Sequence, residues 1–132
     1  MAETRSVNPW TWQEQYVFSQ ALDVRGAQRL LYCAGQTSVD AEGHPMHKGD
    51  MSAQMGLALD NLETILRQAG LTLADVVSVT GYLVDMADFA RYNEIYREYF
   101  TTLPLPTRST VAVSALARGA RIEMTMTAVR SK

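Results

Sequence analysis

Two charged residues near the end of the chain interrupt segments that are otherwise apolar and β-branched. Arg108 stands at the head of the segment 108–113, and Glu123 follows Ile122 in a second apolar segment. A guanidinium presents a rigid fork of donors that matches a carboxylate, so Arg108 is suited to binding a small organic acid. A structural reading is also open, because Arg108 could be solvated at the end of a strand or form an ion pair with Glu123.

The cysteine and the two histidines of the chain do not form a recognisable catalytic or metal-binding pattern in the sequence. Cys33 lies in the apolar run 30–34 without a neighbouring histidine, which favours a small buried side chain over a nucleophile. His44 and His47 share a glycine-containing loop with no further ligand pattern, so we expect exposed histidines and no metal site. The candidate site therefore needs no nucleophile, metal or cofactor. An arginine binds the acid, and a carboxylate places a water beside it.

The composition indicates one folded domain. We expect the 132 residues to form a single domain, 1–132, with residues 1–15 as a polar N-terminal extension. The net charge of -2, without a basic stripe, argues against nucleic acid as a partner. No apolar run approaches membrane-spanning length, so no membrane partner is expected. The single cysteine and the lack of an apolar signal-peptide segment lead us to expect a cytoplasmic protein.

Apolar patterning predicts the elements of the first half. Strands are expected at 16–24 and 29–35, joined as a hairpin, and a loop at 40–49. Apolar side chains then recur at three- and four-residue steps from Met51 to Ala69, which predicts a helix. Asp50 is its expected N-cap, and Gly70 stands where a left-handed residue ends a helix.

The second half predicts a central strand, a helix and two further strands. The strand is expected at 76–84, followed by a helix capped by Asp85. Strands at 108–115 and 121–129 are predicted to form a second hairpin, and the latter alternates apolar with polar side chains. The helix after Asp85 has an apolar face made of Phe89, Tyr92, Tyr96, Tyr99 and Phe100.

Two further features leave alternatives open. Asn93 borders the aromatic face of this helix, so its amide is either satisfied structurally or contacts a ligand. Trp10 and Trp12 either pack the N-terminal segment down or stand at the rim of a cleft.

The order β-β-α-β-α-β-β predicts an α+β fold, a mixed sheet with two helices packed on one face. The other face of that sheet has no element of this chain to cover it. We therefore expect it to meet the same surface of another subunit in an oligomer.

Several short motifs of the chain resemble the Rid family of reactive-intermediate imine deaminases, also called the YjgF-type or L-PSP family. The resemblance runs from about Phe18 to Val129 and is carried by Gly35-Gln36 and by segments 59–62, 84–89, 92–96, 106–111 and 122–123. It implies a chorismate mutase-like fold and a homotrimer whose sheets surround a central barrel, with a cleft at each subunit interface.

The resemblance also implies an activity and a set of site residues. Family members with the arginine hydrolyse 2-imino acids or their enamine tautomers, such as 2-aminoacrylate, to 2-keto acids and ammonia. Arg108 falls on the arginine that binds the substrate carboxylate. Glu123 falls on the glutamate that positions the water or relays its proton, and Gly35 and Asn93 fall on positions that line or support the cleft.

The chain departs from the family pattern at substrate-binding positions. Phe18 replaces the usual tyrosine, and Tyr16 on the same strand face could substitute for it. Thr110 replaces the usual cysteine. Three other functions stay open: a non-catalytic module that binds small carboxylates, an endoribonuclease or translation inhibitor, and a hydrolase for one pathway-specific enamine.

Overall fold

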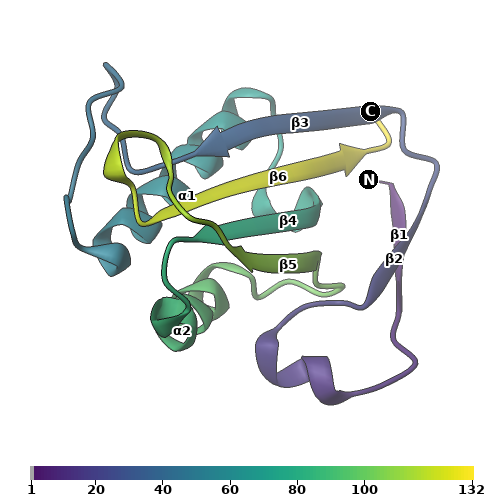
Figure 1. Cartoon of the computed structure of the whole chain (residues 1–132). Helices are drawn as coiled ribbons and strands as arrows, with labels where there is room; N and C mark the ends of the chain where they lie inside the picture. Colours follow the sequence, from purple (N-terminus) through teal and green to yellow (C-terminus); the bar gives the residue numbers. More distant parts are fainter. Residues whose placement is uncertain (1) are drawn as a thin grey trace.

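Four strands form the main sheet of the protein (Figure 1). The structure is a computed structural model that describes residues 2–132. Their order is β3-β6-β4-β5. β4 and β5 are parallel, whereas β6 runs antiparallel to both β3 and β4, so the predicted mixed sheet is confirmed. The bounds are β3 (Arg29–Gln36), β4 (Val76–Leu83), β5 (Thr107–Ala112) and β6 (Ile122–Arg130).

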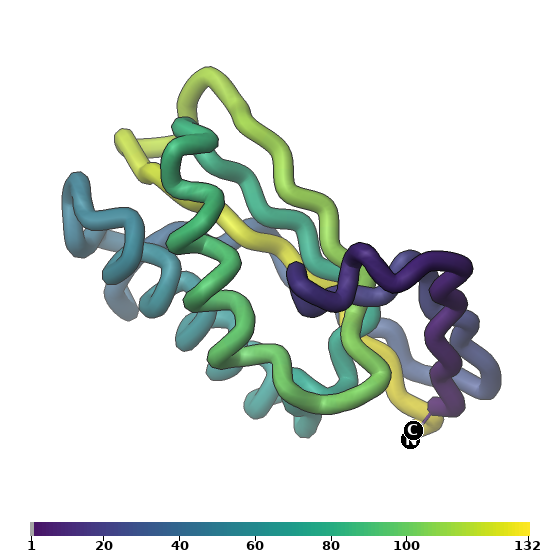
Figure 2. Tube along the Cα trace, turned by 90° about the horizontal axis from the view of Figure 1, so that it is seen from below, coloured from purple at the N-terminus to yellow at the C-terminus, as the bar shows by residue number. Residues whose placement is uncertain are grey.

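Both helices, α1 (Met51–Gln68) and α2 (Phe89–Tyr99), lie on one side of this sheet (Figure 2). The strand facing them alternates as predicted, since every second residue of β6 is buried beneath the helices. Each large apolar side chain buried in this way contributes about 1.5–3 kcal/mol. The β6 side chains in the core are Ile122, Met124, Met126 and Ala128.

Helix ends follow the predicted capping chemistry. The Asp50 carboxylate accepts a hydrogen bond from the backbone N–H of Ala53 at 3.0 Å. Gly70 has a left-handed backbone with φ +78° directly after the helix. Asp85 caps the short 3-10 turn η3 (Met86–Asp88), which continues into α2, and it accepts from the N–H of Ala87 at 2.9 Å.

The N-terminal segment contains a strand that the sequence analysis did not predict. β1 (Glu3–Val7) pairs antiparallel with β2 (Ala21–Arg25) in a separate two-stranded sheet. Between them, η1 (Trp12–Tyr16) is a 3-10 helix, and Val17 after it is left-handed with φ 60°. The predicted strand at 16–24 is therefore wrong over its first half, because the aromatic side chains of that stretch pack on α2 and β5.

Both predicted hairpins are also wrong. β2 pairs with β1 and not with β3, and β4 lies between β5 and β6. The second error has a clear cause: α2 is a crossover that returns the chain parallel to β4, which leaves the other edge of β4 for β6. Hydrophobic periodicity identifies a strand but does not identify its neighbour.

The sheet face opposite the helices is open to solvent. Tyr32 and Leu30 on β3 are 74% and 57% exposed, and Val111 on β5 is 42% exposed. Exposed apolar side chains on a face that no element of the chain covers are typical of an interaction surface. Within residues 2–132, no helix has the length and apolar character needed to cross a membrane.

Candidate functional site

Arg108 lies near the start of β5, on the side of the sheet that carries the helices. Its partner in the parallel ladder is Val79, a buried core residue of β4. The guanidinium carbon is 4.5 Å from the ring centroid of Tyr96, 5.1 Å from that of Tyr92, and 5.6 Å from that of Phe18. At these distances the rings attract the cation through their negative faces.

The aromatic wall behind Arg108 is built by helical spacing. Tyr92 and Tyr96 on α2 and Phe100 at its C-cap recur every four residues, with neighbouring centroids 6.3 Å and 4.3 Å apart. The Thr110 hydroxyl donates to the Tyr92 hydroxyl at 3.0 Å. Gly81 of β4 leaves room for that ring, because a Cβ there would overlap the Tyr92 hydroxyl.

The polar groups around Arg108 leave one of its donors without an acceptor. Nη1 of Arg108 is buried and has no hydrogen-bond partner among the described residues. Burial raises the pKa of Tyr92 and of Tyr96 above the usual value for a phenol, so both rings are neutral. A buried guanidinium donor faced only by neutral rings is suited to an external anion.

A pocket of about 300 Å³ opens beside the guanidinium. Trp12 forms its outer rim and is 54% exposed, with its ring edge-on to Phe18 at 6.0 Å. Most of the wall is aromatic or apolar, and Arg108 supplies the charge. The lining residues are Trp12, Tyr16, Phe18, Met86, Phe89, Arg108 and Thr110.

Three predicted site residues, Arg108, Phe18 and Thr110, thus meet in one pocket. Tyr16, the possible substitute for the missing hydroxyl, also lines it. Met86 and Phe89 also line the pocket, which was not predicted from the sequence. Of the two alternatives for Trp12, packing the N-terminal segment down or standing at the rim of a cleft, its place in the pocket favours the rim. The available signal was the cluster of aromatic residues just before Phe18.

Glu123 and Gly35 lie together at a second location. A Cβ on Gly35 would overlap the Glu123 carboxylate, so the glutamate side chain lies directly over the glycine. Glu123 pairs with Tyr82 on β4, whereas Arg108 pairs with Val79 on the same strand. Val79 and Tyr82 are separated by an odd number of positions. Because side chains alternate along a strand, Arg108 and Glu123 point to opposite faces, with their Cα atoms roughly 14 Å apart. The alternative of an Arg108–Glu123 ion pair is wrong.

Asn93 lies on α2, next to Tyr92, and is half-buried. Its side-chain oxygen is buried without a hydrogen-bond partner in residues 2–132. It does not line the Arg108 pocket.

The remaining reactive residues have structural surroundings. Cys33 is buried, and burial raises the pKa of its thiol, which disfavours a nucleophile. Asp40, Glu42 and His44 form an exposed group whose ligand atoms lie within 4.8 Å of one another. The Asp40 carboxylate is already used by its own loop, accepting from the backbone N–H groups of Glu42 and His44 at 3.0 and 2.9 Å.

Two helices on a mixed sheet, with an arginine in an aromatic pocket at the start of β5, define a small α+β domain with one candidate site for a compact anion. Residues 13–130 match the family model described as Endoribonuclease L-PSP. The chain belongs to this family, which is also the Rid or RutC family of its relatives.

Curated relatives cover most of the chain. Protein DfrA of Myxococcus xanthus is 42% identical over 112 residues, which are 85% of this chain and 84% of that protein. The mouse protein named 2-iminobutanoate/2-iminopropanoate deaminase is 39% identical over 113 residues, 86% of this chain and 81% of that protein.

Solved structures share the fold. The Rid-family protein YyfB of Yersinia pestis, described as a protein of unknown function, superposes with a TM-score of 0.85 at 33% identity, covering 96% of this chain and 98% of that one. The YjgF gene product of E. coli superposes with a TM-score of 0.69 at 32% identity, covering 86% and 87%. The chain is thus similar both to relatives named as deaminases and to a solved structure described as a putative endoribonuclease.

Proposed function

We propose that this protein is a cofactor-independent imine deaminase, which hydrolyses 2-imino acids or their enamine tautomers to 2-keto acids and ammonia. The observation that carries the proposal is the buried, unpartnered Nη1 of Arg108 beside an open pocket. Mouse, rat and human relatives that are 39%, 38% and 35% identical are named 2-iminobutanoate/2-iminopropanoate deaminases.

Arg108 binds the substrate carboxylate in this proposal. A charge-assisted contact of this kind contributes about 1.5–3 kcal/mol to binding. The neutral rings of Tyr92 and Tyr96 hold the guanidinium in place through their negative faces. The apolar wall of the pocket then receives the substrate side chain and displaces water from it.

The chemical step adds one water to the imine. Glu123 accepts a proton as the water oxygen forms a bond to the imine carbon, and the C=N electron pair goes to nitrogen, which takes up a proton. The Glu123 carboxylate then takes the hydroxyl proton of the carbinolamine and passes a proton to the amino nitrogen, so the C–N bond breaks with its electrons going to nitrogen, ammonia leaves, and the oxygen forms the carbonyl of the 2-keto acid. Every proton is returned, so a carboxylate and a positioned water are sufficient.

The proposed site requires two copies of the chain, because Arg108 and Glu123 point to opposite faces of one sheet. We place Glu123 and Gly35 of one copy against the Arg108 pocket of the next, in a homotrimer with a site at each interface. The exposed side chains of Leu30, Tyr32 and Val111 on the open sheet face support such an assembly. We place the reaction in the reducing cytoplasm, where the free Cys33 stays a thiol.

The test generates the imines of alanine and of 2-aminobutanoate in situ with an L-amino-acid oxidase and catalase. Semicarbazide traps the remaining imine, and the adduct is followed by absorbance. The wild-type protein should lower adduct formation, Arg108→Gln should do so much less, and Arg67→Gln, an exposed arginine on α1, should match the wild type. Equal activity of Arg108→Gln and wild type would overturn the assignment.

A non-catalytic binding module is the second candidate, because a single chain has the arginine pocket without the glutamate. It would bind 2-ketobutyrate in an Arg108-dependent way and would not accelerate imine loss. The name of the matched family model also raises ribonuclease activity. Cleavage of labelled RNA that is unaffected by Arg108→Gln would favour that function, whereas the net charge of -2 argues against it.

A further inference from the structure

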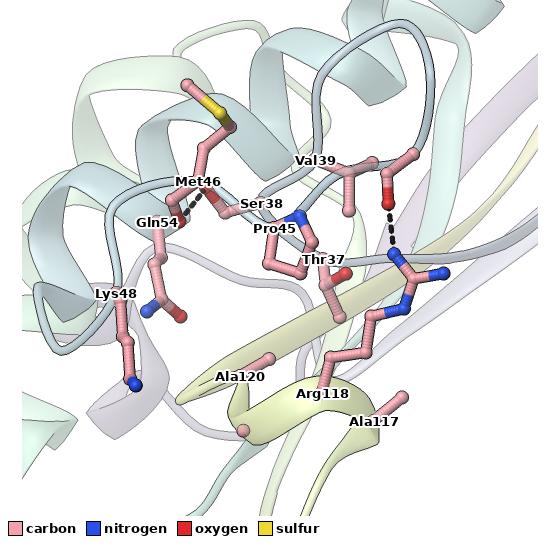
Figure 3. Close-up of a pocket in the computed structure, with 12 residues that line it drawn as sticks. Thr37, Ser38, Val39, Pro45, Met46, Lys48, Gln54, Ala117, Arg118 and Ala120 are labelled. Carbon is pink, nitrogen blue, oxygen red and sulfur yellow. Dashed lines mark hydrogen bonds between the residues drawn. The ribbon is translucent and has the colours of Figure 1, made fainter.

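A second hollow, of about 470 Å³, lies away from Arg108, between the loop after β3 and the turn before β6 (Figure 3). The turn is η4 (Ala117–Gly119). The volume falls in the usual range for small-molecule pockets. The residues that line the hollow are Thr37, Ser38, Val39, Gly43, Pro45, Met46, Lys48, Gln54, Ala117, Arg118, Gly119 and Ala120.

The walls of this hollow are fixed by hydrogen bonds between segments distant in sequence. Gln54 of α1 is only 2% exposed; its amide donates to the His47 carbonyl at 3.0 Å and accepts from the Arg121 N–H at 2.9 Å. The Ser38 hydroxyl donates to the Met46 carbonyl at 3.0 Å. Arg118 donates through Nη1 to the carbonyl of Gly43 and so joins the two loops. The hollow is therefore a preformed cavity.

The charge of the hollow has one sign. Lys48 and Arg118 line it from opposite sides, as Figure 3 shows, and no carboxylate is among its lining residues. Neither cation forms an ion pair with any residue that the structure describes. Along the chain, the acid nearest to Lys48 is Asp50, whose carboxylate accepts from the Ala53 N–H as the cap of α1, and the acid nearest to Arg118 is Glu123.

The lining between the two cations is mainly apolar. Val39 and Pro45 form one side, and the methyl groups of Ala117 and Ala120 form the other, whereas the Met46 side chain points away from the hollow (Figure 3). A bare inorganic anion would leave these surfaces in contact with water. An anion that carries a short hydrocarbon chain would cover them while its charge reaches the cations.

We propose that this hollow is a second binding site, for a small organic carboxylate with a short apolar chain. It is separate from the Arg108 pocket, with which it shares no lining residue. The proposal does not rest on the deaminase activity. Binding there would hold η4, which precedes Glu123 by a few residues.

The test titrates hexanoate into the ¹⁵N-labelled full-length protein and follows backbone amide shifts. Arg108→Ala serves as the background, so that binding in the first pocket does not contribute. We expect shifts at residues 37–48 and 117–120. The combined change Lys48→Gln with Arg118→Gln should weaken binding about tenfold or more.

Two further variants separate loss of the site from loss of the fold. Ala117→Phe keeps both cations and fills the hollow from an exposed position, and it should abolish the shifts. Arg67→Gln removes an exposed charge elsewhere and should leave the affinity unchanged. Hexanamide, which lacks the charge, should not bind.

Three results would overturn the proposal. Shifts confined to residues far from the hollow would do so, as would equal affinity of the Arg108→Ala protein with and without the Lys48/Arg118 double change. Inorganic phosphate binding as tightly as hexanoate would refute the organic ligand class.

Discussion

Arg108 and Glu123 occupy opposite faces of one sheet, on strands that flank β4. One chain therefore carries two separate half-sites, an arginine in an aromatic pocket and a glutamate over a glycine. The proposed reaction needs both, and this requirement makes the arrangement testable in several ways.

Mixing two inactive variants should restore activity. Arg108→Ala chains keep an intact Glu123, and Glu123→Ala chains keep an intact Arg108. After unfolding and joint refolding in equal amounts, random assembly of a closed ring leaves about one quarter of the interfaces with both residues intact. Imine hydrolysis by the mixture should approach that fraction of the wild-type rate. A mixture as inactive as its components would place both residues in the same subunit's site.

Gly35→Ala should displace the Glu123 carboxylate. The new methyl group would overlap that carboxylate, and Gly35 has no left-handed backbone that would itself oppose the change. The overlapping atoms are the far end of a flexible side chain, which can move without shifting the backbone, so thermal stability should change little while kcat falls. The control measurement is the affinity of the variant for 2-ketobutyrate. This affinity should equal that of the wild type, because Arg108 is unchanged. A parallel loss of affinity and kcat would argue against a role confined to the glutamate.

Trp12→Ala should narrow the substrate range. Trp12 stands at the rim of the pocket, edge-on to Phe18, where the side chain of a bound imino acid would extend. Losing this apolar contact should lower kcat/KM for the phenylalanine-derived imine about tenfold. The alanine-derived imine is too small to reach the rim and should be hydrolysed at nearly the wild-type rate. Equal losses for both imines would instead indicate that Trp12 supports the fold of η1.

Gly81→Ala should disturb the wall behind Arg108. The added methyl group would overlap the Tyr92 hydroxyl, and overpacking of this kind costs about 1–3 kcal/mol. Chemical denaturation should show that loss, together with weaker binding of 2-ketobutyrate. Gly56→Ala is the control: its new Cβ meets nothing closer than the Tyr99 hydroxyl at 4.0 Å, and alanine in a helix should stabilise by about 0.5–1 kcal/mol.

Elements defined by local chemistry could be predicted from the sequence. The helix from Met51 was predicted with both its ends, because Asp50 and Gly70 act on backbone groups within one turn of them. Strand neighbours could not be predicted, since β4 enters between β5 and β6 through contacts with no local signature. The same limit applies to the first half of the predicted strand at 16–24.

Arg108 itself could be identified from its unusual place in an apolar strand, but its surroundings could not. The aromatic face of α2 was predicted, yet its position against Arg108 depends on the parallel register that pairs Arg108 with Val79. The contribution of Trp12 depends on η1 folding back toward β5. The separation of Arg108 from Glu123 depends on the register of both strands against β4.

The rim formed by Trp12 has a consequence for how this protein can diversify. Trp12 precedes the segment matched by the family model, and it belongs to a short helix outside the four-stranded sheet. Under the proposed function, the arginine that binds the acid group and one rim residue that meets the rest of the substrate, Trp12, are thus encoded in different stretches of the gene. If this protein is an imine deaminase, substitutions at the Trp12 codon would change which imines it accepts while Arg108 and Glu123 stay in place.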